Sequence, residues 1–389
     1  MDRHNNRQRD RRQWRRHRPE PRGQSADEGR RQADRQGEIS VLVAGRVRGS
    51  VQWGCRKRAW SETQIGKDAA RSGKTWEERK EMPAESDQPY NLDAACHWTP
   101  VRWRSADGLT LAARDWRPLQ PCPDALPVLC LSGLSRNARD FDAVAARLCA
   151  QGRRVVAMDY RGRGDSERDP DWRNYSLPVE GQDIDAGIAT LGLDRFAILG
   201  TSRGGLHAMA MAARHSPSRI AGIVLNDIGP HIEFEAIQRL ATTIGKDMTA
   251  PDWSAMADRL RGKLAAQFTA LSAADWERLA RQMCRQSGPA VAFDYDPALG
   301  KTLEGLDEGA PTPDLWPLFE ALIPIPLLVL RGETSDMFGV QTLAEMAVRH
   351  PNCETLVVPG EGHAPLLWDA ATQEHIAAFL ARVDTSPSC

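Results

Sequence analysis

One serine of this chain stands where a nucleophile could be built. Ser202 is the centre of residues 200–204, Gly-Thr-Ser-Arg-Gly, which match the pattern G-x-S-x-G. The apolar run 195–199 is typical of a buried strand, and the run 205–213 is rich in helix formers. Ser202 is therefore predicted to lie on a sharp strand-to-helix turn, with the Arg203 N–H aimed at a developing oxyanion. The alternative is a small-residue turn without chemistry.

An acid and a histidine follow Ser202 along the chain. Asp336 comes shortly after the predicted strand 326–330, and His363 comes shortly after the predicted strand 354–358. A serine hydroxyl is a poor nucleophile alone, so an imidazole must take its proton and a carboxylate must hold the imidazole in one tautomer. Because ligands bind at the carboxyl ends of parallel strands, we expect these three side chains to meet there.

The elements that must position these residues alternate between strand and helix from about residue 95. This alternation predicts an α/β fold, with a mostly parallel sheet covered by helices on both faces. The predicted strands are 97–104 and 109–117, which form an antiparallel pair, followed by 127–131, 154–158, 195–199, 220–225, 326–330 and 354–358. The predicted helices of this core are 138–152, 179–192, 205–213, 340–350 and 369–383.

Residues 231–315 interrupt the alternation. Trp253, Met256, Leu260 and Leu264 recur at helical spacing, and the segment contains no convincing strand. We interpret it as a helical cap over the cleft, inserted into a core made of residues 95–230 and 316–385. Ordinary peripheral helices are the alternative.

The first 90 residues differ in composition from the rest. They are dense in arginine and poor in aliphatic residues, so they cannot bury enough apolar surface to offset the entropy of ordering. We predict a disordered extension, which a start at Met82 would remove. A basic tail that touches nucleic acid or acidic lipid is the alternative interpretation.

Composition excludes several classes of protein. The net charge of −1 gives no global field that would favour nucleic acid, and no apolar run approaches the length of a membrane span. The eight cysteines are scattered without C-x-x-C pairs, which argues against a disulfide framework or a zinc site and for a reducing compartment. We therefore expect a cytoplasmic protein without a metal.

The region from about 95 to 385 resembles the α/β-hydrolase superfamily, in particular its capped bacterial members, which include esterases, enol-lactonases and carbon–carbon bond hydrolases. The resemblance implies an eight-stranded sheet with Ser202 as nucleophile, His363 as base and Asp336 as the orienting acid. Asp227, which follows the predicted strand 220–225, is the alternative acid. The matched stretches are 132–134, 159–166, the elbow around Ser202, 335–336 and 360–363.

The resemblance also implies an oxyanion hole made of two backbone N–H groups, those of Leu134 and Arg203. Many relatives carry His-Gly ahead of the first donor, where this chain carries Ser132 and a glycine. This departure keeps the backbone donor but removes a side chain that often braces the loop.

The side chain of Arg203 admits two interpretations. It could bind a substrate carboxylate, which would favour acidic lactones or ring-cleavage products. It could instead pair with a protein carboxylate such as Asp227 or Asp165, which we favour. Arg136 and the arginines of loop 159–166 admit the same two interpretations, with the loop arginines expected to brace their Gly-rich turn.

The sequence therefore predicts a serine hydrolase that cleaves a carboxylic ester or lactone of a small molecule through an acyl-enzyme, without a cofactor and as a monomer or homodimer. The alternatives are hydrolysis of a carbon–carbon bond or perhydrolysis on the same triad, or a hydrolase-like protein that only binds a ligand. A dehalogenase or epoxide hydrolase is disfavoured, because those relatives carry aspartate where this chain has Ser202.

Overall fold

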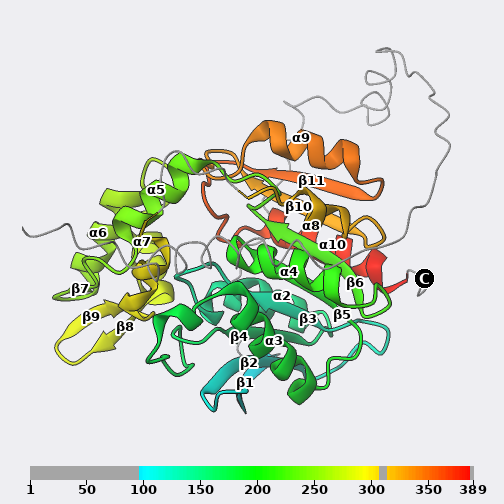
Figure 1. The fold of residues 1–389 in the computed structure, drawn as a ribbon, viewed down its shortest axis with the longest axis horizontal. Helices are drawn as coiled ribbons and strands as arrows, with labels where there is room; N and C mark the ends of the chain where they lie inside the picture. Colours follow the sequence, from blue (N-terminus) through cyan, green and yellow to red (C-terminus); the bar gives the residue numbers. More distant parts are fainter. Residues whose placement is uncertain (1–95, 306–312, 386–389) are drawn as a thin grey trace, which may run out of the picture. The chain divides into compact units, whose positions relative to one another are not determined.

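The computed structural model describes residues 96–305 and 313–385. The predicted N-terminal extension, residues 1–90, lies outside the described residues. An eight-stranded sheet forms the core in the order β1-β2-β4-β3-β5-β6-β10-β11, which confirms the predicted fold (Figure 1). The pairs β1–β2 and β2–β4 are antiparallel, and the remaining pairs are parallel. The strands are β1 (Cys96–Arg104), β2 (Thr110–Pro118), β3 (Val128–Leu131), β4 (Val155–Asp159), β5 (Phe196–Thr201), β6 (Ile220–Asn226), β10 (Leu327–Gly332) and β11 (Cys353–Val358).

The central strands are apolar because both of their faces are covered. Every residue of β3, β4, β5, β6 and β10 is buried, as expected for parallel strands with helices above and below. One apolar cluster joins the sheet to α3 (Leu177–Leu191), α4 (Arg203–Arg214), α8 (Trp316–Glu320) and α9 (Val340–Arg349). A second cluster joins the opposite face to α2 (Asp142–Ala150) and α10 (Ala370–Asp384).

Residues 231–305, which we call the insertion, lie beside the sheet (Figure 1). The insertion contains α5 (Phe234–Thr243), α6 (Trp253–Leu264), α7 (Ala273–Met283) and the 3₁₀ helix η4 (Pro297–Leu303). It has an apolar cluster of its own, which includes Met256, Leu260 and Leu279 and extends to Leu366 of the core. Its role as a cap, and the exact domain bounds, stay a prediction.

We expected the insertion to be all helical, and this prediction was wrong. A small antiparallel sheet of β7 (Thr249–Ala250), β9 (Ala290–Phe293) and β8 (Cys284–Ser287) lies within it. These strands are short, and three of the four residues of β8 are exposed, so no apolar periodicity marks them. The turn residues Gly288 and Pro289, between β8 and β9, were the available sequence signal.

A disulfide joins Cys96 of β1 to Cys149 of α2, with a Cα–Cα distance of 6.1 Å. The scattered cysteines argued against a disulfide framework, and this bond corrects that expectation for one pair. Cys96 and Cys149 are 53 residues apart, and only the packing of α2 against the start of β1 brings them together. Spacing alone therefore could not identify the pair.

Across residues 96–305 and 313–385, none of the helices combines the length and the apolar character that a membrane span requires.

Candidate active site

The turn between β5 and α4 holds Ser202 in a backbone conformation that few residues adopt. Its φ is 51° and its ψ is −112°, and its N–H donates to the Asn226 carbonyl oxygen at 3.0 Å. Two neighbouring glycines make this turn possible, because a Cβ on Gly204 would collide with the Leu131 carbonyl oxygen and one on Gly200 would collide with the backbone of Gly204. The predicted strand-to-helix turn is thus present, and its strain is typical of a functional position.

Ser202 and His363 meet at the carboxyl edge of the sheet. The Ser202 hydroxyl lies 2.9 Å from His363 Nε2, and His363 Nδ1 lies 2.7 Å from a carboxylate oxygen of Asp227. Because an ionised carboxylate only accepts, Nδ1 carries the proton and Nε2 is free to accept from the serine. This arrangement lets the imidazole take the hydroxyl proton.

The acid that contacts His363 is Asp227, which corrects our preference for Asp336. Asp227 follows β6 with a φ of 57°, and its N–H donates to the Leu330 carbonyl oxygen at 2.8 Å. One carboxylate oxygen accepts from the Gly332 N–H at 2.8 Å, and the other accepts from the Ser335 hydroxyl at 2.6 Å as well as from His363. The carboxylate is fully buried and is held by three donors.

Asp336 lies outside this hydrogen-bond chain. Its carboxylate forms two hydrogen bonds with Arg239 of α5, at 2.7 and 2.8 Å, and its side chain is 40% exposed. The predicted motif 335–336 therefore contributes Ser335, which holds the acid, rather than the acid itself.

Of the two predicted oxyanion donors, Leu134 borders the cavity around Ser202, and Arg203 directly follows Ser202 in the chain. Leu134 and Ser202 line the same cavity, and Gly133 packs against Ser202 closely enough that a Cβ there would lie 3.8 Å from the serine Cβ. Arg203 is the first residue of α4, and the first N–H groups of a helix have no partner within it. The positive end of the helix dipole adds to the attraction for a negative charge at this point.

The side chain of Arg203 points away from this cavity. Its Nε donates to Glu180 at 2.6 Å, and a terminal nitrogen donates to the Tyr175 carbonyl oxygen at 3.3 Å. The expected protein carboxylate therefore exists, but it is Glu180 and neither Asp227 nor Asp165. Arg203 does not line the cavity, so its predicted contact with substrate does not fit.

Arg136 does line the cavity, but the carboxylate of Asp140 balances its charge there. It forms two hydrogen bonds with Asp140, each of 2.8 Å, and Gln282 of the insertion donates to the same carboxylate at 2.9 Å. Two cations that the sequence reading missed, Arg239 and Lys263, border the cavity from the insertion. Lys263 is the less committed of the two, since its only ion pair within the described part of the chain is with the exposed Asp247 at 3.6 Å.

The cavity around Ser202 has a volume of about 260 Å³ and lies between the core and the insertion. The core contributes the serine, the histidine and the loops around them. The insertion contributes a mostly apolar wall, made of Leu240, Ile244, Leu260, Leu264, Phe268, Met283 and Phe293. This volume accommodates a small molecule with an apolar part. Among the described residues, no group of His, Cys, Asp or Glu side chains is suited to hold a metal ion.

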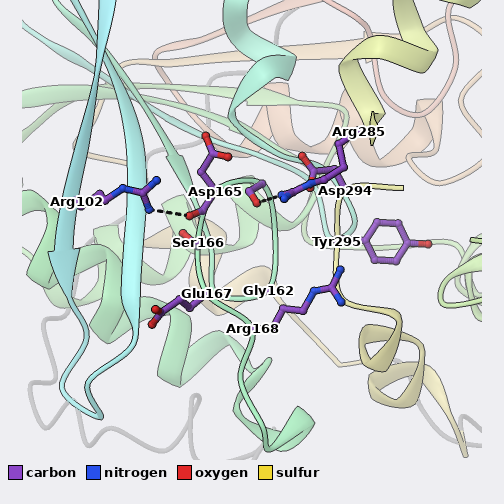
Figure 2. Close-up of a pocket in the computed structure, with 10 residues that line it drawn as sticks. Arg102, Gly162, Asp165, Ser166, Glu167, Arg168, Arg285, Asp294 and Tyr295 are labelled. Carbon is purple, nitrogen blue, oxygen red and sulfur yellow. Dashed lines mark hydrogen bonds and ion pairs between the residues drawn. The ribbon is translucent and has the colours of Figure 1, made fainter. Parts of the chain in front are cut away.

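A second pocket, of about 430 Å³, lies away from Ser202 where loop 162–168 meets the insertion (Figure 2). Arg285 of β8 donates to the Gly164 carbonyl oxygen and pairs with Asp294, and Arg102 of β1 donates to the Asp165 carbonyl oxygen. The bond from Arg285 to Gly164 ties the insertion to the core. Carboxylates stand beside the arginines of this pocket, so its charge favours no particular ligand.

Glu180 is a site residue that the sequence reading missed. It is fully buried on α3 and contacts Arg163, Arg203 and His207. The signal was present in the sequence, because residues 180, 184 and 188 share one helical face and two of them are isoleucines. A carboxylate in line with buried isoleucines indicates a buried cation opposite it.

Comparison with known proteins agrees with this geometry. The family model described as the alpha/beta hydrolase fold matches residues 127–370. The chain belongs to this family. Among curated relatives, 3-hydroxybutyrate-oligomer hydrolase of Cupriavidus necator is 33% identical over 253 residues, which cover 63% of this chain and 84% of the relative. A second relative, 2-(acetamidomethylene)succinate hydrolase of Mesorhizobium japonicum, is 26% identical over 239 residues, covering 61% and 81%.

Solved structures give the same family. The crystal structure of an α/β hydrolase from Novosphingobium aromaticivorans matches with a TM-score of 0.68 and 38% identity, covering 73% of this chain and 98% of that one. The named relatives are hydrolases, and the predicted family is confirmed.

Proposed function

We propose that this α/β hydrolase cleaves a carboxylic ester of a small molecule through an acyl-enzyme on Ser202. The single observation that carries the proposal is the hydrogen-bond chain from Ser202 through His363 to the buried Asp227, at 2.9 and 2.7 Å. The first distance is within the range at which a base takes a proton from a nucleophile, and the second is a hydrogen bond that orients the base.

The reaction proceeds in two halves. His363 Nε2 takes the hydroxyl proton as Ser202 Oγ bonds to the ester carbonyl carbon, and the Leu134 and Arg203 N–H groups hold the resulting oxyanion. The imidazolium returns its proton to the leaving alkoxide as the carbon–oxygen bond breaks, which leaves the acyl-enzyme. Water then attacks, its proton passes to His363, and the acid is released as Ser202 regains its proton.

Two observations support an ester that carries a free carboxylate. The Cupriavidus necator relative is named for hydrolysing oligomers of 3-hydroxybutyrate, and hydroxy-acid units join through ester bonds. Lys263 and Arg239 border an otherwise largely apolar cavity and could bind a carboxylate at a distance from the reacting carbon. Lys263 is the cation we expect to bind it, because Arg239 is already paired with Asp336.

The test compares wild type with Ser202→Ala on four substrate classes: nitrophenyl esters of graded acyl length, linear hydroxybutyrate dimers and trimers, an enol-lactone that bears a carboxylate, and a vinylogous β-diketone with a cleavable carbon–carbon bond. Ser216→Ala is the matched control, because Ser216 is an exposed serine beyond the end of α4. We expect turnover of esters by wild type and by the control, and a loss of about a thousandfold or more in Ser202→Ala.

Other outcomes distinguish the alternatives. Turnover of the β-diketone alone would assign carbon–carbon bond hydrolysis to the same triad. Ester turnover that survives in Ser202→Ala would refute an acyl-enzyme on Ser202. If a folded wild type binds these molecules but converts none of them, ligand binding without catalysis is the better interpretation.

A further inference from the structure

A buried group of charges lies behind the predicted oxyanion hole. Its centre is Glu180, whose side chain has no exposure. One of its oxygens forms an ion pair with Arg163 at 2.8 Å, and the other accepts from Arg203 at 2.6 Å and from His207 at 3.0 Å. Removing a carboxylate from water is costly, so a fully buried one is retained only where its partners are well placed.

Arg163 connects Glu180 to the first predicted donor. Its Nε donates to the Leu134 carbonyl oxygen at 2.9 Å, and a terminal nitrogen donates to the Arg161 carbonyl oxygen at 2.7 Å. The guanidinium is fully buried. Holding the carbonyl group of Leu134 restricts the backbone that also carries its N–H.

Arg203 connects Glu180 to the second donor. Its backbone N–H begins α4 beside Ser202, while its own side chain is anchored to Glu180 behind the turn. One carboxylate therefore restrains both residues whose N–H groups are the predicted oxyanion donors, although Leu134 lies in the loop after β3 and Arg203 begins α4.

Tyrosines complete this support. The Tyr160 hydroxyl donates to the Ser132 carbonyl oxygen at 3.1 Å, and the Arg163 guanidinium lies 5.4 Å from the ring centres of both Tyr160 and Tyr175. The contacts of Tyr160 and Arg163 therefore hold two carbonyl groups of the loop that carries the Leu134 donor.

The charge states of Glu180 and His207 agree with their hydrogen bonds. Burial on its own raises the pKa of Glu180, but the positive charges of Arg163 and Arg203 outweigh it and hold that pKa well below its usual range. Burial lowers the pKa of His207, which is therefore neutral and donates its Nε2–H to the carboxylate. Glu180 is thus an anion at neutral pH.

We propose that Glu180 is a positioning residue for the oxyanion hole, which fixes the Leu134 donor through Arg163 and the Arg203 donor through the arginine's own side chain. The proposal rests on the proposed function. It requires Glu180 to affect the transition state, in which the oxyanion exists, more than the ground-state complex. Loss of a whole oxyanion donor costs about 10²–10³ in kcat, and displacement of two donors falls in or below that range.

The experiment is Glu180→Gln, which keeps the shape of the side chain and removes its charge. Active sites are counted by titration with an irreversible phosphonate, so that kcat refers only to folded enzyme. We expect kcat for an ester to fall about 10- to 100-fold with KM within about threefold, and affinity for an alkylboronic acid, which forms a tetrahedral adduct with the serine, to fall in parallel with kcat.

Asp183→Asn is the matched control. Asp183 lies one turn further along α3, is also buried, and also holds a buried arginine, Arg161, through bonds of 2.7 and 2.8 Å. It contacts neither Leu134 nor Arg203. We expect it to lose stability while its kcat per titrated site stays within about threefold of wild type.

Arg203→Met and Arg203→Lys keep the proposal testable if Glu180→Gln does not fold. Arg203 is partly exposed, and Arg203→Met leaves the Arg163–Glu180 pair intact. We expect kcat per site to fall in Arg203→Met and to recover in part in Arg203→Lys, which restores a cation beside Glu180.

Two results would overturn the proposal. Full kcat per titrated site in both Glu180→Gln and Arg203→Met would show that the charges only stabilise the fold, while leaving the hydrolase assignment intact. An equal loss of kcat in Asp183→Asn would show that any buried charge on α3 has the same effect. Failure of the hydrolase assignment is recognised separately, by Ser202→Ala retaining activity.

Discussion

Replacing the buried acid with its amide, Asp227→Asn, is expected to abolish most of the activity without unfolding the protein. The Gly332 N–H, 2.8 Å from one carboxylate oxygen, needs an acceptor there, so the amide oxygen takes that position. The amide NH₂ must then replace the other oxygen, which faces His363 Nδ1 at 2.7 Å and the Ser335 hydroxyl at 2.6 Å. The hydroxyl can rotate to accept, but the imidazole can only accept at Nδ1.

This reversal places the imidazole proton on Nε2, the atom 2.9 Å from Ser202 Oγ. A nitrogen that already carries a proton cannot take one from the serine. The tautomer change in comparable triads costs about 10⁴ in kcat, which corresponds to about 5 kcal/mol of transition-state stabilisation. We expect a loss of that size in kcat, with KM and the melting temperature close to those of wild type.

Asp336→Asn is the control that separates the two candidate acids. It weakens the pair with Arg239, in which both side chains are more than a third exposed, so the free energy of unfolding should change by less than about 1 kcal/mol. We expect kcat within about threefold of wild type. Steady-state kinetics and thermal melts of both variants decide the matter, and a thousandfold loss in Asp336→Asn with an active Asp227→Asn would refute the reasoning.

Three further predictions concern stability. Burial raises the pKa of Glu361 to about 7 from an ordinary value of 4.5, so the stability that protonated Glu361 contributes is complete below pH 4.5 and is lost as pH rises to 7. Glu361→Gln should therefore raise the free energy of unfolding by up to about 3 kcal/mol at pH 8 and by little at pH 4. Urea unfolding at both pH values measures this difference. Replacing Cys96 and Cys149 with serine removes a cross-link over 53 residues and should cost about 4 kcal/mol, and a melting temperature unaffected by that double change would contradict this estimate. Gly204→Ala places a methyl group against the Leu131 carbonyl oxygen and should cost about 3 kcal/mol or more, with soluble yield and melting temperature as the readouts, whereas a wild-type melt would show that the turn can open.

The elements around Ser202 could be predicted because their signals are local. The strand, the turn and the helix of the elbow are consecutive in the sequence, and a buried parallel strand is marked by its own apolar run. The loop that carries His363 was found in the same way. Such signals do not depend on which distant residues meet.

The choice of acid depends on contacts between distant residues. Asp227 and Asp336 both follow strands that end at the same edge, and β6 and β10 are neighbours in the sheet. Asp227 is selected because its backbone bends at a φ of 57° directly after β6, which brings its carboxylate to His363. Asp336 forms an ion pair with Arg239 of the insertion instead of contacting His363. No periodicity in the sequence carries that information.

For the Arg203 side chain, a protein carboxylate was correctly predicted as the partner, but the wrong residues were named. A protein carboxylate was expected, yet Glu180 lies 23 residues away on another helix, and its burial follows from how α3 packs on the sheet. The short strands β7, β8 and β9 escaped notice for a similar reason, since pairing with one another rather than an apolar run defines them.

The central claim is that Ser202 becomes covalently acylated during turnover. The direct measurement is intact-protein mass spectrometry of wild type and Ser202→Ala, acid-quenched during hydrolysis of a nitrophenyl ester, followed by peptide mapping. We expect a mass increase equal to the acyl group, located on the peptide that contains residue 202 and absent from the variant. Rapid turnover without any adduct, or an adduct that persists in Ser202→Ala, would contradict it.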